Sequence, residues 1–118
     1  MKYAIVGSLD WGDEFLVRKF VRLLPRDSTV ISGGASGPDS FAVDEASKIG
    51  LETIVYLADW KLHGKSAGYK RNILIVNSCD KLIAFWDGMS KGTKHSIDLA
   101  KKQDKIQQIF LPKGMETL

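Results

Sequence analysis

Five short apolar segments, rich in β-branched and aromatic residues, alternate with helix-like segments along the chain. They span residues 2–6, 29–32, 53–57, 81–86 and 107–111. Because they are continuous apolar runs and not alternating patterns, we expect both faces of each strand to be buried. Strands joined by helices pair in parallel through right-handed crossovers. The sequence therefore predicts one Rossmann-like α/β domain over residues 1–118, a five-stranded parallel sheet in the order 3-2-1-4-5 with helices on both faces.

The segments between the strands carry apolar residues at helical spacing. This spacing predicts four helices, over about residues 11–24, 36–49, 67–78 and 92–103. Asp10 is the expected N-cap of the first helix, because its carboxylate suits the free backbone amides there. The connection after the third strand shows no helical period, and we expect it to be a loop of about eight residues.

Composition limits the classes of protein to which the chain can belong. It is 44% hydrophobic and 26% charged, which is typical of one globular domain. No segment has the roughly 20 apolar residues that a membrane helix needs, and the N-terminal run lacks a signal-peptide cleavage site. The single cysteine, Cys79, cannot form an internal disulfide, and no Cys/His cluster suggests zinc. We therefore expect a cytoplasmic protein with no membrane partner.

The net charge of +3 is unevenly distributed along the chain. Residues 1–58 hold six basic and eight acidic residues, a net −2, whereas residues 59–118 hold eleven and six, a net +5. The basic half suits an anionic ligand, and a solvated lysine-rich helix face explains it equally well. The excess is too small to indicate nucleic acid by itself.

Glycine-rich loops follow the second and fourth strands. In parallel sheets, ligands bind at the carboxyl ends of the strands, where the strand order reverses. Residues 32–39 contain three glycines, which leave room for a phosphate beside bare amides and the positive end of the next helix. Residues 86–93 open another helix and add the hydroxyls of Ser90 and Thr93. We expect the two loops to face each other across the first strand, although a tight turn with a good cap also explains the first loop.

The loop after the third strand combines an aromatic residue with cations. A phosphate at the start of the following helix would meet both Lys65 and Arg71, and Arg71 offers a bidentate fork. Asn72 would read a base edge or bond neighbouring loops. Trp60 would line a base pocket or wedge the loop onto the sheet. The lysines of this loop are also explained as solvated side chains.

The residues expected to bind a ligand all lie in these loops or at the ends of strands. They are Gly7, Ser8, Gly33, Gly34, Ala35, Ser36, Gly37, Asp39, Asp59, Trp60, Lys65, Arg71, Asn72, Trp86, Asp87, Gly88, Ser90, Gly92 and Thr93.

Three blocks of sequence, residues 32–39, 58–72 and 85–93, together resemble the YpsA-related branch of the SLOG superfamily. The resemblance implies a nucleotide or nucleotide-derived ligand such as AMP, ADP-ribose or NAD, and a homo-oligomer. Small members of this superfamily occur in bacteria and phages. Its relatives include the "lonely guy" cytokinin-activating enzymes and the DprA proteins, which load a recombinase on single-stranded DNA.

The chain departs from the hydrolytic relatives at one position. Those enzymes carry Gly-Gly-x-Gly-Thr-x-x-Glu, and the resemblance places Ser96 where the glutamate acts on the N-glycosidic bond. Serine cannot supply the carboxylate that such cleavage uses. Asp39, Asp59 and Asp87 are candidate substitutes, and nothing in the sequence selects among them. His95 is a further acid/base candidate, although a solvent-facing helix histidine explains it better.

Three functions follow from these observations. We favour a non-enzymatic sensor or sequestering module that binds a small-molecule nucleotide. The alternative is a nucleotide N-glycoside hydrolase that releases base from a nucleoside monophosphate, with Asp87 or Asp39 as its carboxylate. The third is single-stranded nucleic acid binding through Trp60 and Trp86 with Lys65 and Arg71, but we do not expect nucleic acid to be the partner. No metal or cofactor is required, although magnesium is compatible with a ligand phosphate.

Overall fold

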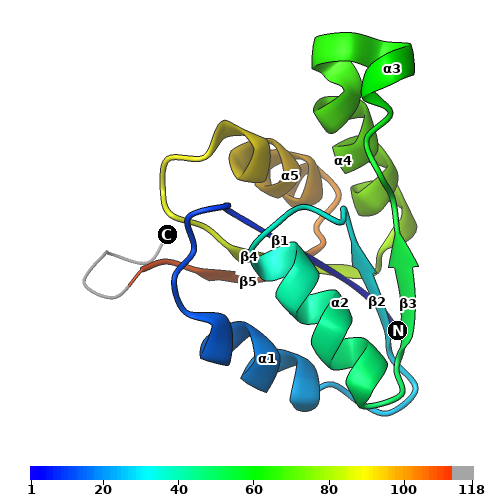
Figure 1. The fold of residues 1–118 in the computed structure, drawn as a ribbon, viewed down its shortest axis with the longest axis vertical. Helices are drawn as coiled ribbons and strands as arrows, with labels where there is room; N and C mark the ends of the chain where they lie inside the picture. Colours follow the sequence, from blue (N-terminus) through cyan, green and yellow to red (C-terminus); the bar gives the residue numbers. More distant parts are fainter. Residues whose placement is uncertain (113–118) are drawn as a thin grey trace.

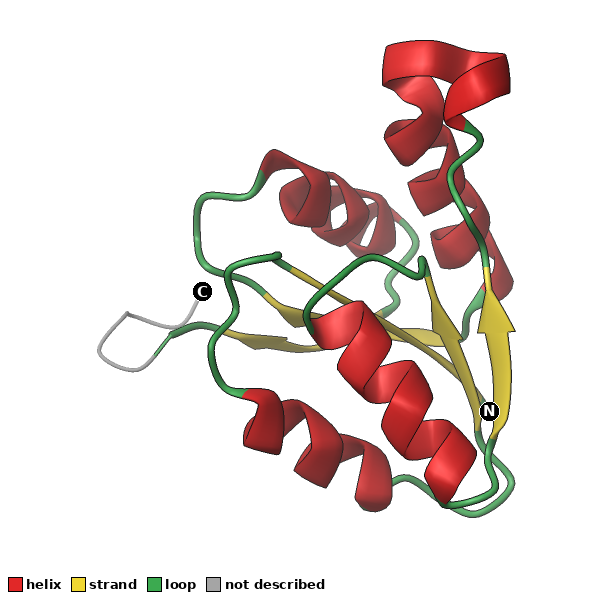
Figure 2. Ribbon diagram, in the orientation of Figure 1, coloured by secondary structure: helices red, strands yellow, loops and turns green. Residues whose placement is uncertain are grey.

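The computed structural model describes residues 1–112, which form one parallel sheet with helices on both faces (Figures 1 and 2). The strands are β1 (Lys2–Gly7), β2 (Thr29–Ser32), β3 (Glu52–Val55), β4 (Lys81–Phe85) and β5 (Ile106–Phe110). Their order is β3-β2-β1-β4-β5, and each neighbouring pair is parallel. The predicted fold class and strand order are therefore confirmed.

Side chains that alternate along the central strand β1 build the two helix layers. The longer helices are α1 (Glu14–Arg22), α2 (Pro38–Lys48), α4 (Ala67–Ser78) and α5 (Lys91–Lys102). Tyr3 and Ile5 of β1 pack in one core cluster with α1 and α2. Ala4 and Val6 pack in a second cluster with α4 and α5. β1 thus packs against both helix layers, and its carboxyl end lies between them.

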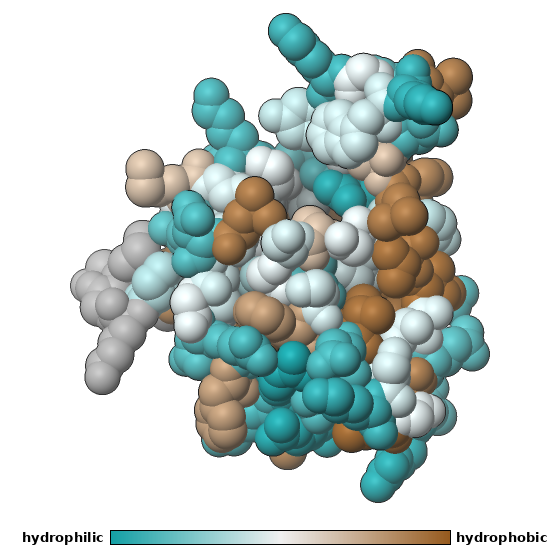
Figure 3. Space-filling view, in the orientation of Figure 1, coloured by the Kyte–Doolittle hydropathy of each residue, from teal (hydrophilic) through white to brown (hydrophobic). Residues whose placement is uncertain are grey.

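The expectation that every strand is buried on both faces is wrong for the two edge strands. β3 and β5 consist mostly of half-buried and exposed residues. Val55 of β3 is 41% exposed, and Leu57 just after it is 74% exposed. Figure 3 shows apolar surface along this side of the molecule. An apolar run in the sequence does not distinguish a central strand from an edge strand.

The first helix begins later than the sequence pattern predicts. Asp13, not Asp10, is its N-cap, and its carboxylate accepts a hydrogen bond of 3.0 Å from the Leu16 amide. The preceding chain instead forms a turn in which the Trp11 amide donates to the Ser8 carbonyl. The Trp11 side chain is buried against Phe85, with ring centroids 5.5 Å apart, and its indole nitrogen donates to the Asp13 carbonyl at the start of the helix.

The expected loop after β3 contains two short helical turns. These are α3 (Trp60–His63) and the 3-10 turn Gly64–Ser66, which lead directly into α4. Asp59 caps α3 by accepting a hydrogen bond of 3.0 Å from the Leu62 amide. None of the helices in residues 1–112 is long and apolar enough to cross a membrane.

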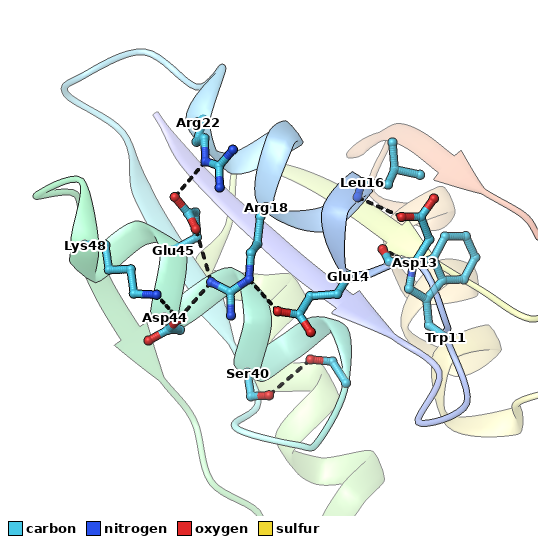
Figure 4. Close-up of polar contacts among 11 residues, drawn as sticks. Trp11, Asp13, Glu14, Leu16, Arg18, Arg22, Ser40, Asp44, Glu45 and Lys48 are labelled. Atoms are coloured by element: carbon cyan, nitrogen blue, oxygen red, sulfur yellow. Dashed lines mark hydrogen bonds and ion pairs between the residues drawn. The ribbon is translucent and has the colours of Figure 1, made fainter.

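An ion-pair cluster ties α1 to α2 on the face away from α4 and α5 (Figure 4). The Arg18 guanidinium lies 2.8 Å from carboxylate oxygens of Glu14 and Asp44, and 3.1 Å from Glu45. Arg22 reaches the other oxygen of Glu45 at 2.9 Å. Three carboxylates around one guanidinium raise the pKa of Arg18, so this side chain remains charged.

Candidate functional site

A cleft of about 290 Å³ lies at the carboxyl edge of the sheet, where the ends of β1, β2 and β4 come together. α4 and the N-terminus of α5 form its other side. The predicted site residues that line it come from the end of β1 and from all three sequence blocks: Gly7, Ala35, Asp39, Trp60, Arg71, Asn72, Ser90, Gly92 and Thr93. The strand order places these distant segments at one edge.

Arg71 and Asp39 hold the loop after β2 in place from two sides. Arg71 Nη1 donates to the Gly33 carbonyl oxygen at 2.7 Å, and the Gly33 amide donates to the Asp39 carboxylate at 2.9 Å. Burial raises the pKa of Asp39, although the hydrogen bond from Gly33 and the charge of Arg71 oppose the shift. The Gly33 amide, expected to face a phosphate, is therefore already engaged by a carboxylate.

Glycine is required at particular points of this loop. Gly34 and Gly37 have φ angles of +70° and +83°, which L side chains rarely adopt. At Gly33 the restriction is space, because a Cβ there would lie 2.5 Å from Arg71 Nη1. The glycines thus serve the turn and the close approach of Arg71.

Asn72 joins α4 to the start of α5. Its side-chain amide donates to the Gly92 carbonyl at 3.2 Å and lies 3.3 Å from His95 Nδ1. The His95 ring packs on Tyr69 with centroids 4.6 Å apart, and burial lowers the pKa of His95. Of the two roles considered for Asn72, the structure shows a hydrogen bond to a neighbouring segment, here the first turn of α5.

Hydrogen bonds within the chain also fix the loop after β4. Ser90 is the N-cap of α5, and its hydroxyl donates to Thr93 Oγ1 at 3.2 Å. The Asp87 carboxylate accepts from the Met89 and Ser90 amides at 2.8 and 2.7 Å. Burial opposes ionisation of Asp87, but these hydrogen bonds outweigh it and lower its pKa. Asp87 faces other hollows than the central cleft, among them one lined by Asp10, Trp11 and Leu111.

A second hollow, of about 310 Å³, adjoins the cleft and shares Trp60, Arg71, Asn72 and Gly92 with it. Its remaining lining residues are Lys65, Gly68 and Tyr69. Trp60 is 61% exposed and Tyr69 is 46% exposed. Sequence reasoning missed Tyr69, because an aromatic residue on an apolar helix is ordinarily a core residue.

The other predicted site residues either line a third hollow or form turns and hydrogen bonds within the loops. Gly33 and Gly34 line a third hollow with Trp60 and Arg71. Asp59 caps α3, Gly88 turns at φ +83°, and Ser8 Oγ accepts from the Asp87 amide. Trp86 is only 8% exposed and donates through Nε1 to the Ser90 carbonyl, so it offers no stacking face. Sequence reasoning also missed three apolar cleft residues that carry no ligand-binding signal in the sequence, Val6, Leu9 and Ile75, and it noted Ser96 only as the replacement of a catalytic glutamate.

The fold is the Rossmann-like fold of DprA proteins. DNA processing protein A from Streptococcus pneumoniae matches with a TM-score of 0.77 and 20% identity, over 93% of this chain and 49% of that chain. DNA processing protein A from Helicobacter pylori matches with a TM-score of 0.74 and 22% identity, over 99% and 67%. The chain thus spans about half the length of the S. pneumoniae protein. DprA proteins are among the relatives that the sequence resemblance named, and these two matches show that the chain shares their fold.

No protein-family model matches the sequence. The chain is 35% identical over 108 residues to the Gene 61 protein of Mycobacterium phage D29, and the match covers 83% of this chain and 86% of that protein. The chain belongs to the family of that phage protein.

The similarity to DprA corrects one expectation about the partner. We expected a small-molecule nucleotide and did not expect nucleic acid. That expectation is wrong, because the H. pylori protein of the same fold is described by its single-stranded DNA binding mode.

Proposed function

We propose that the chain binds single-stranded DNA along the carboxyl edge of its sheet. The observation that carries the proposal is the hollow in which the exposed rings of Trp60 and Tyr69 lie with Lys65 and Arg71. Bases would stack on the two rings, while the cations would meet the phosphates.

The physical requirements of single-strand binding match this hollow. Stacking of a base on an aromatic ring contributes about 1–3 kcal/mol and tolerates any sequence, because every base has a π face. Lysine and arginine add the salt-dependent attraction of phosphates. Trp60 and Tyr69 come from two neighbouring helical segments, α3 and α4. A DNA strand that stacks on both rings would pass Arg71, which lines the cleft.

The stacking residues differ from those that the sequence indicated. We expected Trp60 and Trp86 to act together, but the Trp86 ring is buried. Tyr69 takes its place in the proposed interface, since it shares the second hollow with Trp60. The hydrolase alternative gains no support from residues 1–112, where Asp39 and Asp87 both accept backbone hydrogen bonds. A homo-oligomer, which would lengthen the interface, stays a prediction.

Fluorescence anisotropy with a labelled dT 12-mer tests the proposal. We expect affinity to fall with salt, with a logarithmic slope of about −0.7 for each phosphate contacted. A duplex of the same length should bind much more weakly, because its bases cannot reach the rings. AMP and ADP-ribose serve as competitors, and displacement of the 12-mer by either one at equimolar concentration would contradict a strand as the ligand.

Matched variants locate the interface. Trp60→Ala and Tyr69→Ala should each lower affinity at least about fivefold, which is the lower limit for one stacked base. Phe15→Ala is the control, since Phe15 is 66% exposed on α1 and lines neither the cleft nor the second hollow. Lys65→Ala should make the logarithmic salt slope shallower by about 0.7, the value for one phosphate contact, whereas Lys19→Ala on α1 should leave the slope unchanged. Equal effects of the test and control variants, or no binding at low salt, would overturn the proposal.

A further inference from the structure

A chain of hydrogen bonds connects Arg71 of α4 to a histidine of α5. Arg71 Nε donates to the side-chain oxygen of Asn72 at 3.1 Å. The side-chain nitrogen of Asn72 donates to the Gly92 carbonyl oxygen at 3.2 Å and lies 3.3 Å from His95 Nδ1. Because Asn72 is only 6% exposed, these partners, and not solvent, satisfy its amide. Asn72 is therefore the link between the Arg71 guanidinium and the His95 ring.

The partners of Asn72 determine which way its amide points. Arg71 Nε can only donate a hydrogen bond, and the Gly92 carbonyl can only accept one. A reversed amide would place two donors together at Arg71 and two acceptors together at Gly92. The amide nitrogen therefore also faces His95, whose Nδ1 has to be the acceptor, with the ring proton on Nε2. This arrangement requires a neutral His95 ring.

A proton on His95 Nδ1 is incompatible with the arrangement. It would face an N–H of Asn72, so that two donors would meet where one hydrogen bond had been. Asn72 cannot turn its oxygen toward the ring without giving up its hydrogen bond from Arg71. Protonation of His95 therefore loosens the support of the Arg71 guanidinium.

The charges around His95 favour the neutral ring near neutral pH. The titratable and charged groups near the ring come from two helices: Tyr69 and Arg71 of α4, and Lys94, Asp98 and Lys102 of α5. Burial is the main cause that lowers the pKa of His95, and the charge of Lys102 adds to it. Asp98 opposes the shift, but its carboxylate also pairs with Lys94 at 2.8 Å.

We propose that His95 is a positioning residue that holds Arg71 through Asn72, and that a proton on His95 weakens binding of the strand. His95 lines neither the cleft nor the second hollow, so it acts through Arg71 and not by touching DNA. This inference rests on the proposed binding of single-stranded DNA and adds a pH-dependent control to it. Its sign is distinctive, because an added positive charge by itself would strengthen the attraction of phosphates.

The affinity for a dT 12-mer at about pH 8 and about pH 5 tests the proposal, since histidine changes its charge in this range. His95→Asn keeps an oxygen acceptor close to the position of Nδ1 and cannot take up a proton. It also loses the ring contact with Tyr69, but at both pH values, so the ratio of the two affinities isolates the proton. His63→Asn is the matched control, since His63 is the other histidine of the chain and its Nδ1 faces Lys70 Nζ at 3.1 Å. Thermal unfolding at both pH values reports whether each variant is folded.

We expect the affinity of the wild-type chain to fall about fivefold more than that of His95→Asn between the two pH values, as the loss of one hydrogen bond predicts. His63→Asn should keep the pH dependence of the wild-type chain. Equal pH dependence of the wild-type chain and His95→Asn would overturn the inference, as would a relative gain of wild-type affinity at the lower pH. Failure of the wild-type chain to bind the 12-mer at about pH 8 would instead overturn the proposed function itself.

A double variant tests whether His95 acts through Arg71. In the Arg71→Ala background the group that His95 positions is absent, so His95→Asn should no longer change the pH dependence. Low salt keeps the remaining phosphate contacts strong enough for the measurement. An undiminished effect of His95→Asn in this background would show that His95 acts by another route and would overturn the inference.

Discussion

The Arg71 guanidinium and the Gly33 carbonyl oxygen lie 2.7 Å apart, although the two residues are 38 positions apart in sequence. This bond joins α4 to the loop after β2 at the mouth of the central cleft. Because the Gly33 amide also donates to Asp39, hydrogen bonds connect Arg71, Gly33 and Asp39 along one side of the cleft. Arg71 is therefore both a cation for the proposed strand and a support for the loop beside it.

Substitution of Gly33 should disturb Arg71 without removing any charge. The Cβ of Gly33→Ala would meet only Arg71 side-chain atoms within 3.0 Å, so the guanidinium has to move. We expect both this variant and Arg71→Ala to lower dT 12-mer affinity about tenfold, because a charged hydrogen-bonding group loses its position. Anisotropy titration measures both variants.

Gly12→Ala is the matched control for this experiment, since a Cβ at Gly12 meets nothing within 4 Å. It should bind the 12-mer like the wild-type chain. Full affinity in Gly33→Ala would show that the position of Arg71 is not important for binding.

The charge of Asp39 should reduce stability near neutral pH. Burial raises the pKa of this carboxyl, so the folded chain holds its proton more tightly than the unfolded chain does. The stability that the neutral Asp39 carboxyl contributes is complete at pH values below its pKa in the unfolded chain. This contribution is lost as pH rises through its higher pKa in the folded chain. Asp39→Asn, which imitates the protonated form, should therefore unfold at a higher temperature than the wild-type chain near neutral pH.

Thermal unfolding across a range of pH checks this sign. The difference between Asp39→Asn and the wild-type chain should shrink below about pH 4, where the wild-type carboxyl also becomes neutral. Asp39→Ala separates charge from hydrogen bonding, because it leaves the Gly33 amide without its acceptor. A lower Tm for Asp39→Asn at neutral pH would mean that the hydrogen bond from Gly33 and the nearby charge of Arg71 outweigh the cost of burying the Asp39 charge.

The sequence was sufficient to predict the sheet and the edge at which the site lies. Apolar runs separated by helical segments fix a parallel order, and that order brings the loops after β2 and β4 to one cleft. The sequence also placed Arg71 and Trp60 at this edge, and both line the cleft, although their role in binding stays a prediction.

The orientation of single side chains was not predictable in the same way. Trp86 follows a buried strand directly, and its ring is covered because its indole nitrogen bonds to Ser90 in the turn. Tyr69 lies on a helix rich in apolar residues, yet it is 46% exposed and its ring packs on His95 of α5. Such outcomes depend on which face a loop covers, and local spacing does not determine that.

The ion-pair cluster around Arg18 should contribute to stability and not to DNA binding. Arg18→Met keeps much of the packing but leaves Glu45, a nearly buried residue, with Arg22 alone. We expect Tm to fall by about 5 °C, because three partners are lost at once. Anisotropy should give wild-type affinity for the 12-mer, since the cluster lies outside the cleft. A large loss of affinity would mean that α1 and α2 shape the interface after all.

The rate at which a reagent labels Cys79 should fall when a ligand binds, because the ligand lowers the population of unfolded chain in which the thiol is accessible. Cys79 is 4% exposed, and burial raises the pKa of its thiol, so the reactive thiolate is scarce in the folded chain. A disulfide reagent should therefore label the native chain slowly and the denatured chain quickly, to one equivalent per chain. If labelling requires global unfolding, a dT 12-mer at 100 times its Kd should slow it about 100-fold, because a ligand of the folded state lowers the unfolded population. Rapid labelling of the native chain, or no effect of saturating 12-mer, would show that the chain opens locally at Cys79.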